Sequence, residues 1–222
     1  MTFLRNIAAT ALVLGLSAGA AAASTVTLEK TYANLFGDTD EQRLRESVSV
    51  NYGTETINAY AGAFRISEAQ GKSFIAFCVE LAEGLKLPFE FTKTKALFDA
   101  ATTQRVAQLF GTAYEQVTDD TSAAAFQVSL WEIVTDQDGS LDLDDGIFVL
   151  NSGGDVRTTA LGFLSGLSDP TDNRTNLTFY AAPGSQDVVT GTVSPVPVPA
   201  AGLLLIGGLG GLMVLRRARA AA

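Results

Sequence analysis

The chain has 222 residues, a formal net charge of −9, one cysteine and no histidine. The absence of histidine excludes Ser-His-Asp and Cys-His nucleophilic sites, and one cysteine without histidine leaves no donor set for a zinc site. Residues 24–191 hold all 24 acidic residues but only 11 of the 15 basic ones, which argues against binding nucleic acid or anionic lipid because both require basic patches.

Residues 1–23 have the pattern of a secretory signal peptide. They contain one basic residue, Arg5, an apolar run from Ile7 to Leu16, and an alanine-rich end before Ser24. Small residues after such a run mark a cleavage site. A transmembrane anchor is the alternative, but the run is shorter than the roughly 20 residues that a span requires. We therefore expect an exported protein.

The region up to about residue 92 is expected to form mostly β-strands. Polar and apolar residues alternate over 24–28 and 47–52, as they do in half-buried strands. Residues 73–79 are nearly all apolar, which predicts a strand covered on both faces, with Cys78 in it or at its end. Pro88 indicates that the run around it is an edge strand or a bend, because proline has no backbone N–H to donate to a neighbouring strand.

Between about residues 95 and 135 the apolar period changes to that of helices. Asp119 to Ser122 separates two predicted helices and supplies the N-terminal cap of the second. The apolar positions of these helices recur three and four residues apart. They are Val106, Leu109, Phe110, Tyr114 and Val117 in the first helix, and Phe126, Leu130, Ile133 and Val134 in the second.

The rest of the chain up to residue 191 returns to short strands after an acidic loop, 136–145. Strands are expected at 147–150, 176–181 and 187–192. Strands, a helical insert and further strands predict one α+β domain over 24–191, dominated by antiparallel sheet or barrel. Calcium binding is an alternative interpretation of the acidic loop. The helix-loop-helix calcium template requires glycine at its sixth position and glutamate at its twelfth, and counted from Asp136 these positions hold Leu141 and Ile147. We therefore favour a solvated loop and expect no metal or other cofactor.

Cys78 and Gln127 are the two side chains whose chemistry needs an explanation. Exported proteins usually pair their cysteines as disulfides, which a lone cysteine cannot do within its chain. Cys78 is therefore an inert buried thiol or a thiol kept for another bond. Gln127 lies one turn from Trp131 on a mostly apolar stripe of the second predicted helix. Its plain interpretation is a boundary glutamine beside a core tryptophan.

Two segments together resemble the thioester domains of bacterial surface adhesins. They are Phe77-Cys78-Val79 and Phe126-Gln127-Val128-Ser129-Leu130-Trp131. The resemblance implies that the Cys78 thiol condenses with the Gln127 carboxamide, with loss of ammonia, and that Phe77 and Trp131 shape the surrounding pocket. It extends to about Phe148, and Gly184-Ser185-Gln186-Asp187 near the domain end also fits thioester-domain proteins of Gram-negative origin. Ser129 stands where many members carry alanine.

The C-terminal region resembles a PEP-CTERM sorting signal of the Val-Pro-Leu-Pro-Ala type. It consists of a proline-rich linker, 192–199, an apolar segment, 200–215, and a basic tail, 216–222. The sorting motif is Val196, Pro197, Val198, Pro199 and Ala200, with Val198 in place of the usual leucine. The resemblance implies export across the inner membrane of a Gram-negative bacterium, a transient transmembrane anchor, and cleavage by an exosortase-type protease. A permanent C-terminal anchor is the alternative.

These observations predict a cell-surface or extracellular-matrix protein rather than an enzyme. The leading hypothesis is an adhesin whose Cys78–Gln127 thioester acylates an amine on a surface or matrix partner in a single turnover. The main alternative is a structural protein of the exopolysaccharide or biofilm matrix, with the same fold and a buried free Cys78. A carboxylate-dependent glycosidase that acts on exopolysaccharide is a third hypothesis.

Overall fold

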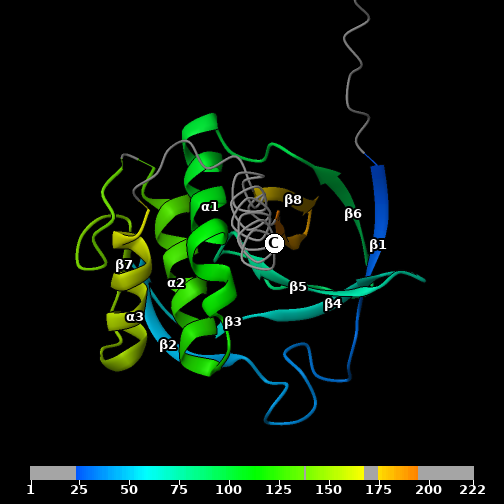
Figure 1. The fold of residues 1–222 in the computed structure, drawn as a ribbon, viewed down its shortest axis with the longest axis horizontal. Helices are drawn as coiled ribbons and strands as arrows, with labels where there is room; N and C mark the ends of the chain where they lie inside the picture. The colour runs from blue at the N-terminus through cyan, green and yellow to red at the C-terminus, as the bar shows by residue number, and fades with distance from the viewer. Residues whose placement is uncertain (1–23, 138, 168–174, 195–222) are drawn as a thin grey trace, which may run out of the picture.

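The computed structural model describes residues 24–137, 139–167 and 175–194 (Figure 1). The predicted signal peptide, 1–23, and the sorting motif Val196 to Ala200 lie outside the described residues. The predicted transmembrane segment, 200–215, and the basic tail also lie outside them. Within the described part of the chain, no helix combines the length and apolarity needed to cross a bilayer.

The fold is mostly antiparallel β-structure, as predicted. The strands are β1 (Ser24–Lys30), β2 (Arg45–Tyr52), β3 (Glu55–Gly62), β4 (Phe64–Glu68), β5 (Ser73–Cys78), β6 (Phe89–Thr94), β7 (Phe148–Leu150), β8 (Thr175–Ala182) and β9 (Ser185–Val193). Six of them close a barrel in the order β1-β4-β5-β9-β8-β6, and the other three form a sheet in the order β3-β2-β7. Every strand pair in the described residues is antiparallel.

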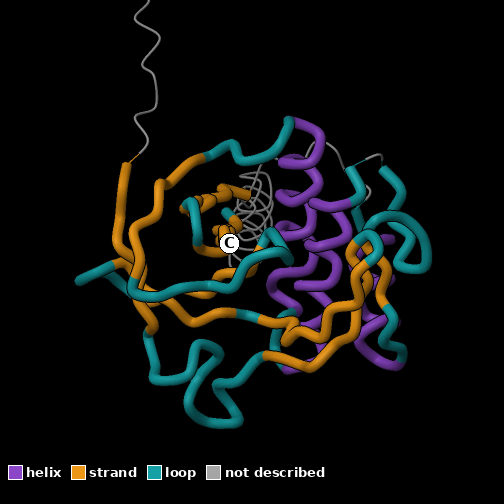
Figure 2. Tube along the Cα trace, turned by 180° about the vertical axis from the view of Figure 1, so that it is seen from behind, coloured by secondary structure: helices purple, strands orange, loops and turns teal. Residues whose placement is uncertain are grey.

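Three α-helices gather at one side of the barrel (Figures 1 and 2). They are α1 (Ala100–Ala113), α2 (Asp120–Thr135) and α3 (Gly154–Ser165), and a short 3-10 turn, Tyr114–Gln116, follows α1. Helix α2 contacts α1, α3 and the three-stranded sheet. It is buried on every side from Ser122 to Val134, and this stretch includes the polar residues Gln127, Ser129 and Glu132. It therefore forms the centre of the helical layer.

The cap predicted within Asp119 to Ser122 is confirmed, and the structure assigns it to Asp119. The Asp119 carboxylate accepts a hydrogen bond from the Ser122 backbone N–H, at 2.7 Å. The Ser122 hydroxyl in turn contacts the Asp119 N–H, at 3.0 Å, so the two residues form a capping box. This reciprocal pair fixes the first turn of α2 and thereby the rotation of the helix that carries Gln127.

Helix α3 was not predicted, and it is the main difference from the expected element order. It begins at Gly154, contains two adjacent threonines and has no side-chain cap, so its local helix propensity is low. Its buried residues are Val156, Ala160, Phe163 and Leu164. These positions follow the helical spacing i, i+4, i+7 and i+8, which is the signal that identifies the helix.

The acidic loop after α2 is closed by hydrogen bonds from its own ends. Both oxygens of Asp136 accept from backbone N–H groups, those of Ile147 at 2.8 Å and of Phe148 at 3.0 Å. Gly146 has a φ of +111°, and a Cβ there would lie 2.5 Å from an Asp136 oxygen. Among the described residues, which do not include Asp138, no group of three or more acidic or cysteine side chains is placed to hold a metal ion.

Candidate functional site

The structure brings Cys78 and Gln127 into direct contact. Cys78 is the last residue of β5, and Gln127 lies in the first half of α2. The Cys78 backbone N–H donates to Gln127 Oε1 at 2.9 Å, and Gln127 Nε2 donates to the Cys78 carbonyl oxygen at 2.8 Å. The carboxamide thus pairs with the backbone of the residue whose sulfur it would have to meet.

Strand pairing explains why the Cys78 backbone is open to this contact. Strand β4 pairs with β5 only as far as Phe64↔Ala76, so Cys78 lies two residues beyond the last pair on that side. On the other side Cys78 faces Val188, while the neighbouring Val79 N–H bonds to β9. Buried backbone groups require partners, and the Gln127 side chain takes the place of the missing strand.

The sulfur of Cys78 has its own hydrogen-bond donor. Trp131 Nε1 lies 3.1 Å from Cys78 Sγ, and it reaches the sulfur because Trp131 follows Gln127 by one helical turn. Cys78, Gln127 and Trp131 are 3 %, 1 % and 2 % exposed. Burial raises the pKa of the Cys78 thiol to about 12, and the indole N–H lowers it only in part. The thiol is therefore protonated at neutral pH and shielded from solvent.

Phe77 lies in an aromatic cluster that joins β5 to the helices. Its ring centroid is 4.4 Å from that of Phe126, 6.1 Å from Phe110 and 6.4 Å from Tyr114. Phe77 is fully buried. Its ring therefore holds the end of β5 against α1 and α2, which fixes the distance between Cys78 and the helix that carries Gln127.

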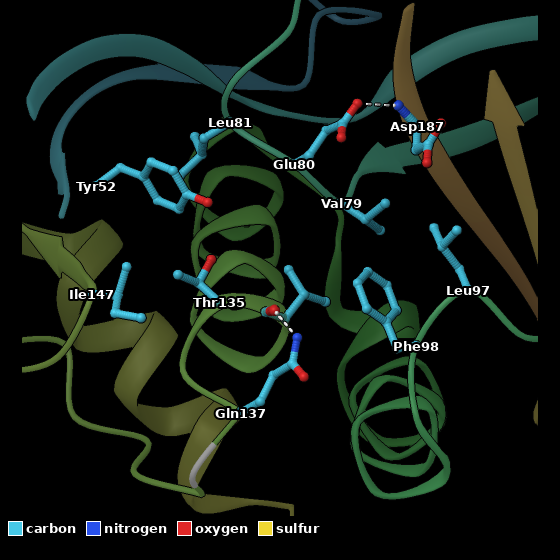
Figure 3. A pocket seen from close by; sticks show the side chains of 11 residues that line it. Tyr52, Val79, Glu80, Leu81, Leu97, Phe98, Thr135, Gln137, Ile147 and Asp187 are labelled. Carbon is cyan, nitrogen blue, oxygen red and sulfur yellow. Dashed lines mark hydrogen bonds between the residues drawn. The ribbon is translucent and has the colours of Figure 1, made fainter. Parts of the chain in front are cut away.

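A cavity of about 360 Å³ is lined by the segment that follows Cys78 and by the end of α2, but by neither Cys78 nor Gln127 (Figure 3). Val79, the residue after Cys78, lines it, as does Val134, one turn beyond Trp131. The other lining residues are Tyr52, Glu80, Leu81, Leu97, Phe98, Thr135, Gln137, Ile147 and Asp187. Tyr52 and Ile147 are 39 % and 52 % exposed, so the cavity reaches the surface.

Two acidic residues of this cavity, Glu80 and Asp187, were not predicted as site residues. Glu80 Oε1 accepts from the Asp187 N–H at 2.9 Å, and Gln186 Nε2 donates to the Glu80 carbonyl oxygen at 2.8 Å. Residues 184–187, noted for their resemblance, thus contact the segment that follows Cys78. No spacing could have joined Glu80 to Asp187, because they are 107 positions apart and meet only through the pairing of β5 with β9.

The arrangement supplies the parts of an intramolecular acyl transfer. A backbone N–H contacts the oxygen that would carry negative charge when a nucleophile attacks the Gln127 carboxamide carbon. The candidate nucleophile, Cys78 Sγ, is on the same residue as that N–H, and the Trp131 indole N–H could donate a hydrogen bond to the thiolate.

Searches against models of protein families, curated proteins and solved structures found no match to this chain.

Proposed function

We propose that Cys78 and Gln127 condense to an internal thioester, which then acylates an amine on a partner molecule. The observation that carries this proposal is the pair of hydrogen bonds between the Gln127 carboxamide and the Cys78 peptide group, with Trp131 on the sulfur. On this basis we assign the barrel and its helices to the thioester-domain type. The support is that the cysteine ends a barrel strand and the glutamine lies on the central helix.

Formation of the bond balances within the two side chains. Cys78 Sγ attacks the Gln127 carboxamide carbon, and the Cys78 N–H stabilises the charge that develops on Oε1. The C–N bond then breaks, the thiol proton passes to the departing nitrogen, and ammonia leaves. Because both groups are buried, water is kept from the product until an acceptor arrives.

Intact mass of the folded wild-type protein tests this proposal. The thioester lowers the mass by about 17 Da, the mass of ammonia. Cys78→Ala and Gln127→Ala should each abolish the deficit. Gln186→Ala is the matched control, because the Gln186 amide is also part of this region but donates to Glu80 rather than to Cys78. Full sequence mass together with one titratable thiol per chain would refute the covalent bond.

A structural matrix protein with a free Cys78 is the second candidate, and one observation favours it. The Gln127 carboxamide already satisfies both backbone groups of Cys78 without any covalent bond. In that case Gln127 acts as a substitute for a strand, and its loss destabilises the fold without any change in reactivity. The mass measurement separates the two candidates.

We further propose that the protein acts at the cell surface or in the extracellular matrix of a Gram-negative bacterium, in adhesion or attachment. The support is the sequence of residues 1–23 and of the C-terminal region, where Val196 to Ala200 would be recognised by an exosortase-type protease. Protein recovered from the surface should lack residues 1–23 and the apolar segment 200–215. Recovery of a surface protein that lacks residues 1–23 but keeps residues 200–222 would argue for a permanent C-terminal anchor instead.

A further inference from the structure

Strand β3 is an open edge of the three-stranded sheet. The barrel is closed and has no edge, and in the order β3-β2-β7 the two outer strands are β3 and β7. Strand β7 has only three residues, and its outer side is occupied. There the Leu150 N–H donates to the Leu143 carbonyl oxygen at 2.9 Å, and the Phe148 N–H donates to Asp136 at 3.0 Å. Among the described strands, β3 is therefore the long edge that is left open.

The hydrogen bonds of β2 show which backbone groups of β3 point outward. In an antiparallel pair, successive residues direct their N–H and C=O groups alternately to one side and the other. The Ser49 carbonyl oxygen accepts from the Asn151 N–H at 2.8 Å, on the side of β2 away from β3. Asn58 lies opposite Ser49, so its backbone groups also point away from β2. By the same alternation, those of Thr56 and Tyr60 point outward too.

These outward groups of Thr56, Asn58 and Tyr60 have no hydrogen-bond partner within residues 24–137, 139–167 and 175–194. All three residues are exposed. Open edges in natural sheets are usually protected by lysine, proline, a bulge or a short strand. Strand β3 has eight residues and pairs with β2 without a register shift, and its one charge is Glu55 at its start. It therefore suits the addition of another strand.

The side chains of β3 are already divided between two faces. Ile57 and Ala59 are half-buried on the face that packs on the core and on α2. Figure 2 shows the helices on this one side of the three-stranded sheet. Asn58 and Tyr60 are exposed on the other face, where the Arg45 guanidinium lies 3.8 Å from the centroid of the Tyr60 ring. An added strand would continue both faces and cover the rest of Ile57 and Ala59.

We propose that β3 pairs antiparallel with β3 of a second copy of this chain, about a two-fold axis at Asn58. This register places Asn58 opposite Asn58, and Thr56 opposite Tyr60 of the second copy. Each of these pairs exchanges two backbone hydrogen bonds. A shift of the axis by one residue in either direction leaves one of the three residues without another of the three opposite it. The two sheets become one, in the order β7-β2-β3-β3-β2-β7.

The sequence of β3 is self-complementary in this register, which is why a second copy fits the edge. The bulky Ile57 lies opposite the small Ala59 of the other strand on the buried face. The two Asn58 carboxamides lie side by side, and each has both a donor and an acceptor for the other. Glu55 lies opposite Ala61 rather than opposite the other Glu55, so no like charges meet directly.

The pairing does not depend on the thioester and has a consequence for either candidate function. In an adhesin it joins two Cys78–Gln127 sites in one particle, so that attachment at the second site becomes an intramolecular step. In a structural matrix protein it supplies a contact between subunits.

The state of association tests this inference. Sedimentation equilibrium of the full chain in density-matched detergent should give twice the chain mass of 23.2 kDa. Asn58→Pro removes the N–H at the axis but no bond to β2, and an edge strand tolerates proline where the missing N–H would face outward. This variant should sediment as a monomer with an unchanged far-UV circular dichroism spectrum. Asn58→Thr is the control, because it keeps the N–H, and it should remain a dimer.

Single cysteine substitutions test the register independently. Asn58→Cys places two thiols opposite each other in a hydrogen-bonded pair, where the Cα atoms are about 5.5 Å apart and a disulfide can form. Thr56→Cys is the matched control, because the two Thr56 residues would be displaced by four residues along the strands, or about 14 Å, which is too far. Mild oxidation should cross-link the Asn58→Cys protein between copies and not the Thr56→Cys protein. Cys78 is buried and takes no part in either.

Three results would overturn the inference. They are a monomeric wild-type protein, an Asn58→Pro protein that dimerises as the wild type does, and equal cross-linking of the two cysteine variants. Each of them can be read whether or not the thioester forms, so a failure of the pairing and a failure of the proposed function are distinguishable.

Discussion

Replacement of Trp131 by phenylalanine should slow aminolysis of the thioester without preventing its formation. The indole N–H lies 3.1 Å from Cys78 Sγ and would stabilise the thiolate as it leaves. A hydrogen bond to a charged group contributes about 1.5–3 kcal/mol, and each 1.4 kcal/mol is a factor of ten in rate. In the thioester the sulfur carries little charge, and in the transition state of aminolysis it becomes negative. The loss of this hydrogen bond therefore raises the free energy of the transition state more than that of the thioester. We therefore expect Trp131→Phe to react roughly 10- to 100-fold more slowly.

The rate of methylamine incorporation, followed by intact mass at constant pH, measures this effect. Trp131→Phe also leaves space in the core, since Trp131 packs on Phe148 with ring centroids 6.2 Å apart. Phe148→Leu is therefore the matched control, because it disturbs the same contact but keeps the indole N–H. A folded Trp131→Phe protein that carries the thioester and reacts as fast as Phe148→Leu would refute the role of the N–H.

Two further predictions concern the segments on either side of the site. Asp136→Ala should lower the free energy of unfolding by about 1–3 kcal/mol in urea titrations, because the buried N–H of Phe148 loses its acceptor, whereas Asp145→Ala on the same loop should have little effect. Asp119→Ala should cost about 1 kcal/mol at neutral pH as a lost helix cap. Hydrogen bonds from Ser122 hold the pKa of Asp119 below its usual value, so this contribution is lost as the pH falls through the lowered pKa; a cost that stays constant on acidification would contradict the assignment.

The sequence predicted the local elements of the site well, because each has a clear period. Continuous apolar residues predicted a buried strand at 73–79, and the structure places Cys78 at its end. Helical spacing and the Asp119 cap predicted α2, with Gln127 and Trp131 one turn apart. Helix α3 was not predicted because its glycine and threonine residues have low helix propensity, although its buried residues keep helical spacing.

The contact between these elements could not be read from periodicity. The Gln127 carboxamide meets Cys78 only because β4 stops pairing at Phe64↔Ala76, which leaves two backbone groups of β5 without a strand partner. The end of a strand pairing depends on where a distant segment turns, and no local pattern encodes it. The same holds for Glu80 and Asp187, which the closure of the barrel brings together.

The proposed covalent bond would change the stability of the protein through two opposing terms. Loss of ammonia removes Nε2 and leaves the buried carbonyl of Cys78 without its donor, at a cost of about 1–3 kcal/mol. In return, the bond closes a loop between residues 49 positions apart, and a cross-link of that span restricts the unfolded chain by about 4 kcal/mol in the chain-entropy account. The two terms would leave a modest net gain in the stability of the cross-linked protein. Because folding alone does not decide between the two states, their populations depend on the chemistry at Cys78 and Gln127.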